Sequence, residues 1–200
     1  MQSFTLCAVG FDHLGFTLRP KTVESPQYRI DFLSKLEFLG SGMEYDGVIL
    51  PSGIYERHRI QPERDGERTL VDSETDLIQK TEKKIDAIWA KGGWVLILAD
   101  AITDRVNESR SATIVNDTDL SKRLLNRYQI QRQLVSGRNL TDVRHPILAD
   151  YAKSYAYIQT TFFLPAKEKI TELVSCSQGV AGFSIDSKLY VLPYFRHYSK

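Results

Sequence analysis

The sequence predicts an α/β domain with a mostly parallel central sheet and a β-hairpin near the C-terminus. The prediction depends on residues 73–104, where a helix is followed by two glycines, an apolar strand and an aspartate. Residues 94–99 are apolar at every position, which is typical of a strand buried on both faces by helices. A second apolar strand, over residues 45–50, ends in a turn that contains proline and glycine.

The helix of this central unit is expected to begin at Ser73, because Ser73 and Asp76 fit a capping box. The apolar residues that follow recur along one stripe of a 3.6-residue helix: Leu77, Ile78, Ile85, Ile88 and Trp89. Gly92-Gly93 is the expected stop, since glycine takes a left-handed C-terminal position without a steric penalty.

The composition indicates one domain over residues 1–200 and excludes several function classes. A formal net charge of +1 gives no overall attraction to nucleic acid or to anionic lipid. No apolar run is long enough to span a bilayer, and residues 1–5 do not resemble a signal peptide. Two cysteines far apart in the sequence are expected to be free thiols in a reducing compartment, which favours the cytoplasm.

In the first half of the chain, residues 4–9 are predicted to form a strand and 10–15 a glycine-containing turn. Residues 16–28 are expected to be a loop, and residues 28–39 a short amphipathic helix ended by Gly40-Ser-Gly42. Residues 54–72 are rich in charge and poor in apolar side chains, so they are expected to form an exposed insertion.

The second half is expected to contain further strands, a helix and a closing hairpin. In order, we expect a polar irregular segment at 103–119, a helix at 120–128, an edge strand at 130–135, a turn region at 136–142, a strand at 160–164, a strand or short helix at 170–176, and hairpin strands at 180–185 and 188–192. Asp186-Ser187 would form the hairpin turn. The aromatic residues at 193–200 suggest the N-terminal part of a longer protein.

Four motifs follow one another in a characteristic order: Tyr45-Asp-Gly-Val-Ile-Leu-Pro-Ser-Gly53, Gly92-Gly-Trp-Val-Leu96, Arg144-His-Pro-Ile147, and Gly182-Phe183 with Lys188-Leu-Tyr-Val-Leu-Pro193. This order, over residues 4–193, resembles the class I glutamine amidotransferase-like superfamily, especially its ThuA-like and other branches without amidotransferase activity. The resemblance implies a flavodoxin-like three-layer sandwich. It does not by itself imply a function, because one fold serves many chemistries.

Catalytic members of that superfamily carry a cysteine in the tight turn after the Gly-Gly strand. Here that turn reads Leu98-Ala-Asp-Ala-Ile102, without a cysteine, serine or threonine. The resemblance therefore implies a non-catalytic domain, without catalytic residues, cofactor or bound metal. Such a domain would sense a ligand or bind a protein partner within a larger protein.

Polar residues follow three of the predicted strands, where the ligand crevice of an open α/β sheet lies. They are Asp12, His13, Ser52, Glu56, Asp100 and Asp104. If the strand ends meet, these residues could bind a polar ligand or a hard metal ion. The alternative is that Asp12, Asp100 and Asp104 only cap local turns. An enzyme that uses the carboxylates, either a metal-dependent hydrolase or a sugar-modifying enzyme, is the second hypothesis for the function.

The remaining reactive side chains favour structural roles. Cys7 lies mid-strand among apolar neighbours, and Cys176, in Ser175-Cys-Ser-Gln-Gly179, only superficially resembles a nucleophile turn. His145 precedes a proline and is expected to make a structural hydrogen bond.

Several basic residues of the second half could line one face that contacts phosphate: Lys122, Arg123, Arg127, Arg132, Arg138 and Arg144. Interspersed acids and the lack of stacking aromatics favour a solvated surface instead. We therefore expect a small-molecule or protein partner, with a homo-oligomer as a further option, and neither nucleic acid nor membrane.

Overall fold

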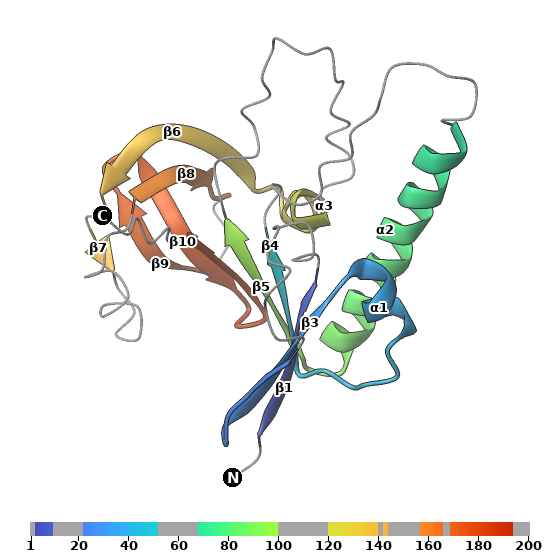
Figure 1. Cartoon of the computed structure of the whole chain (residues 1–200). Helices are drawn as coiled ribbons and strands as arrows, with labels where there is room; N and C mark the ends of the chain where they lie inside the picture. The colour runs from blue at the N-terminus through green and yellow to red at the C-terminus, as the bar shows by residue number, and fades with distance from the viewer. Residues whose placement is uncertain are drawn as a thin grey trace, which may run out of the picture.

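The computed structural model describes residues 3–9, 22–51, 68–99, 120–139, 142–143, 157–165 and 169–193. Three strands come first among the described residues, helices and strands then alternate up to residue 126, and further strands follow (Figure 1). In chain order they are β1 (Phe4–Val9), β2 (Thr22–Glu24), β3 (Tyr28–Leu33), α1 (Lys35–Gly40), β4 (Gly47–Pro51), α2 (Arg68–Ala90), β5 (Trp94–Ala99), α3 (Leu120–Asn126), β6 (Gln131–Asn139), β7 (Asp142–Val143), β8 (Tyr157–Phe163), β9 (Ile170–Cys176), β10 (Gly179–Ile185) and β11 (Leu189–Pro193).

These strands form a single sheet in the order β2-β3-β1-β4-β5-β11-β10-β8-β6, with β9 paired to β10 and β7. The central strands β3, β1, β4, β5 and β11 are parallel to their neighbours in this group. Counted along the chain, they follow the order 2-1-3-4-5 of a doubly wound sheet. The α/β class and the parallel centre are thus confirmed, but beyond β11 the sheet is antiparallel.

The predicted helix over residues 28–39 is wrong in its first half, because residues 28–33 form β3. Apolar and polar side chains alternate there with a period of two, and β3 pairs with β1 from Phe4 opposite Tyr28 to Val9 opposite Leu33. The helix starts only after Ser34, which makes a capping box with Glu37. Part of the loop expected at 16–28 also forms a strand, β2.

Helix α2 begins at Arg68, so Ser73 lies inside the helix and does not cap it. The charged insertion expected over 54–72 is therefore helical from residue 68, and its earlier residues lie outside the described part of the chain. The predicted stop is confirmed: Gly92 has a φ of 91°, and the N–H of Gly93 donates to the carbonyl of Ile88 over 3.0 Å. Within the described ranges, no helix is long and apolar enough to cross a membrane.

The hydrophobic core lies between one face of the sheet and the three helices (Figure 1). Val95 and Ile97 of β5 are fully buried in one cluster with Ile85 of α2, Leu124 of α3 and Phe38 of α1. The other side chains of β5 are only half-buried, because burial alternates along the strand. The described helices thus cover one face of the sheet, and the predicted three-layer sandwich stays a prediction.

Besides this apolar packing, an ammonium group connects helix α1 to α2. Lys84 of α2 donates hydrogen bonds to the carbonyl oxygens of Phe38 and, over 2.7 Å, of Ser41. These carbonyls lie at the C-terminal end of α1, where a cation is favourable. The ammonium also lies 4.7 Å from the centre of the Phe38 ring. Burial lowers the pKa of Lys84.

The hairpin predicted at Asp186-Ser187 is confirmed. Both residues have positive φ angles, 51° and 54°, and the N–H of Lys188 donates to the carbonyl of Ile185 over 2.9 Å. Positive φ at both central residues is the mark of a type I′ turn. This turn returns the chain as β11, which fits between β10 and β5.

Gly47 of β4 lies directly under the indole ring of Trp94 on β5. A Cβ atom at Gly47 would come within 2.5 Å of that ring, which also packs edge-on against Tyr190. We expect Gly47→Ala to destabilise the protein by about 1–3 kcal/mol, because the indole cannot move without repacking. Urea denaturation would measure the loss.

The matched control is Gly42→Ala, since a Cβ there meets no atom within 4 Å. Its effect should be neutral or stabilising by up to about 1 kcal/mol. Equal losses from both substitutions would contradict the packing described at Trp94.

Candidate functional site

The carboxyl ends of β1, β4 and β5 lie side by side in the sheet. Ala8 of β1 pairs with Ile49 of β4, and Pro51 of β4 pairs with Leu98 of β5. From β1 the chain continues toward β3 on one side, whereas from β4 it continues toward β5 on the other. This reversal makes a topological switch point between β1 and β4, where open α/β sheets bind their ligands.

The six residues predicted for a ligand site follow these strand ends in sequence: Asp12, His13, Ser52, Glu56, Asp100 and Asp104. All six lie outside the residues that the structure describes. What the structure brings together is the three strands that precede them. Ser52 comes directly after Pro51, and Asp100 directly after Ala99, so both are one residue from neighbouring strand ends. The site itself stays a prediction.

Within the described ranges, no group of three or more histidine, cysteine or acidic side chains could hold a metal ion. His13, His58, His145 and His197 are all outside these ranges, so the structural role predicted for His145 is not tested.

Both cysteines are buried free thiols, as the sequence analysis expected. Cys7 is fully buried in the middle of β1, with its Sγ atom 3.8 Å from the carbonyl oxygen of Gly47. Burial raises the pKa of the Cys7 thiol to about 12, so the group is protonated and a poor nucleophile at neutral pH. Cys176 packs at the end of β9 in a second, smaller apolar cluster with Val174 and Ala181.

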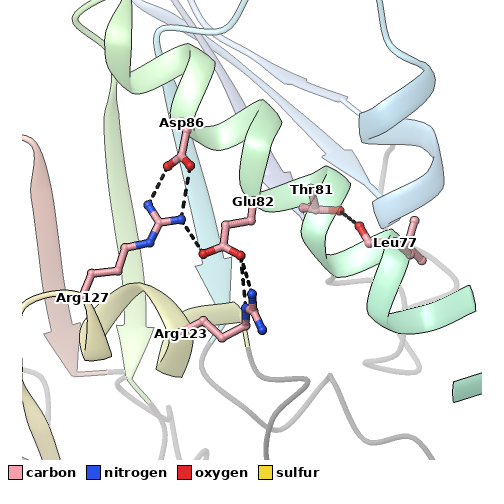
Figure 2. A network of polar contacts seen from close by, with 6 residues as sticks. All are labelled: Leu77, Thr81, Glu82, Asp86, Arg123 and Arg127. Atoms are coloured by element: carbon pink, nitrogen blue, oxygen red, sulfur yellow. Dashed lines mark hydrogen bonds and ion pairs between the residues drawn. The ribbon is translucent and has the colours of Figure 1, made fainter. Parts of the chain in front are cut away.

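Arg123 and Arg127, two members of the predicted basic face, are paired with acids of α2 (Figure 2). Arg123 donates to one carboxylate oxygen of Glu82 over 2.8 and 3.1 Å. Arg127 donates to the other Glu82 oxygen and bridges both oxygens of Asp86, over 2.7 and 3.2 Å. We call these four residues the α2–α3 clamp.

The charges of the clamp strengthen one another. Burial alone would raise the pKa of Glu82, but the hydrogen bonds and charges of Arg123 and Arg127 outweigh it and lower that pKa. Hydrogen bonds to Asp86 and Glu82 raise the pKa of Arg127, against the effect of its burial. Glu82 is the most enclosed member, with 13% of its side chain exposed. These two arginines are thus held by acids of the same chain, which weakens the case for a phosphate-binding face.

A buried acid that the sequence analysis missed is Asp31 of β3, which is 5% exposed. Its carboxylate accepts hydrogen bonds from Thr22 over 2.9 Å, from Arg29 over 3.0 Å and from Tyr45 over 3.3 Å. The period-two alternation of residues 28–33 would have indicated a strand, but it would have placed Asp31 on the solvent face, because buried faces are normally the apolar ones. These three hydrogen bonds compensate for the burial of the Asp31 charge. They also connect β3 to Thr22 of β2 and to Tyr45, which lies just before β4.

Comparisons with known proteins give no family assignment. No protein-family model matches the sequence, and no curated protein is similar to it in sequence. Among solved structures, the chain is similar to a Thermoplasma acidophilum protein provisionally described as one of the subunits of a GMP synthase. The two are 11% identical, the match covers 96% of this chain and 83% of that chain, and the TM-score is 0.46. A likeness this distant carries no functional argument.

The clamp predicts a pH-dependent contribution to stability. Because the pKa of Glu82 is lower in the folded protein than its ordinary value of 4.5, the ionised clamp stabilises the fold above that pH. Glu82→Gln should cost about 2 kcal/mol at neutral pH, since it removes the charge from three charge-assisted hydrogen bonds. The difference from the wild type should shrink as the pH falls below 4.5 through the folded pKa.

Denaturant titrations over a pH series would test this, with Asp86→Asn as the control. The side chain of Asp86 is 45% exposed, so its loss should cost less than about 1 kcal/mol. A Glu82→Gln penalty that is the same at neutral and acidic pH would show that ionisation of Glu82 contributes nothing.

Proposed function

We propose that this chain is a glutamine amidotransferase-like α/β domain that works without the nucleophile of that superfamily. In this proposal it binds a polar small molecule, or a protein partner, at the carboxyl edge of the parallel strands. The motif order supports the superfamily assignment, and the 2-1-3-4-5 strand order is compatible with it. The observation that carries the proposal is the switch point at the ends of β1 and β4, which is followed by acids and a histidine but by no nucleophilic thiol.

The position of the two cysteines supports a non-catalytic domain. A catalytic cysteine must reach its substrate and ionise readily. Cys7 is sealed inside the sheet with a raised pKa, and Cys176 is buried at the far, antiparallel end of the sheet. Both being free thiols fits a reducing compartment, and we propose a cytoplasmic location on that basis.

The chemistry of the residues at the strand ends suggests the class of ligand. Asp12, His13, Ser52, Glu56, Asp100 and Asp104 offer carboxylate, imidazole and hydroxyl groups. Carboxylates accept hydrogen bonds and attract cations, so a ligand with hydroxyl or amino groups suits them best. Binding by a protein partner at the same edge would use the same groups.

A non-catalytic domain predicts that purified protein turns over no glutamine, peptide or ester substrate above background. The assay would compare the wild type with Cys7→Ala and Cys176→Ala, each checked for folding by circular dichroism. Turnover by the wild type that disappears in either variant would overturn the proposal, because it would identify a working thiol.

The second candidate is a metal-dependent hydrolase or a sugar-modifying enzyme that uses the carboxylates, and the adjacency of the three strand ends favours it. It predicts binding of Mg²⁺ or Mn²⁺, measured by calorimetry, that is lost in Asp12→Asn and in Asp100→Asn. Asp76→Asn is the control, since Asp76 lies on the exposed side of α2, paired with Lys80. Absence of metal binding by the wild type would leave the non-catalytic proposal as the better one.

A further inference from the structure

We draw no further inference here: the strongest candidate, the small surface patch of the exposed aromatic side chains Phe4 and Tyr28 at the amino ends of β1 and β3, carries nothing, because nothing in the structure shows what covers it.

Discussion

The structure depends on the packing of α2 against the middle of the parallel sheet. Ile78 and Ile85 of the helix belong to one buried cluster with Val48, Val95 and Ile97 of β4 and β5, and all of these side chains are 2% exposed or less. Burial of each such aliphatic side chain contributes about 1.5–3 kcal/mol. This packing fixes which face of β4 and β5 points inward, and through the pairing it fixes the direction of β1 and β11 as well.

Polar contacts then attach the smaller helices to α2. Lys84 reaches the last carbonyls of α1, and Glu82 and Asp86 hold the two arginines that belong to α3 and the turn after it. Both contacts are partly shielded from water, so they specify one arrangement more strongly than exposed ion pairs would. The segments that carry the candidate ligand residues start at strand ends which this arrangement holds in place, and one of them leads into α3.

The elements that could be predicted are those whose local sequence pattern matches the position that they take in the folded sheet. Residues 94–99 are apolar throughout and are followed by an aspartate, and Asp186-Ser187 separates two apolar runs, so both were identified from sequence. Residues 28–33 were not, because Ile30, Leu33 and Leu36 also fit the spacing of a helix, and the period-two alternation of a strand was therefore not recognised. Ser73 fitted a helix start, but a local cap signal cannot exclude a helix that continues before it. For the candidate site, the sequence indicated that the acids follow three strands. It did not indicate that these strands are neighbours, because no local pattern encodes strand order. The structure shows that β1, β4 and β5 are adjacent.

The position of β11 has a consequence for how the chain folds. It completes the parallel sheet beside β5, yet Leu189 and its partner Val95 are separated by most of the second half of the chain. Closing so long a loop costs conformational entropy before any stabilising contact between β11 and β5 can form. The pairs β9–β10 and β10–β11, in contrast, join strands that are close in sequence and need only short loops. The C-terminal hairpin should therefore form early as a local unit and dock onto β5 late, so that the rate of folding is limited by the meeting of the two halves of the sheet.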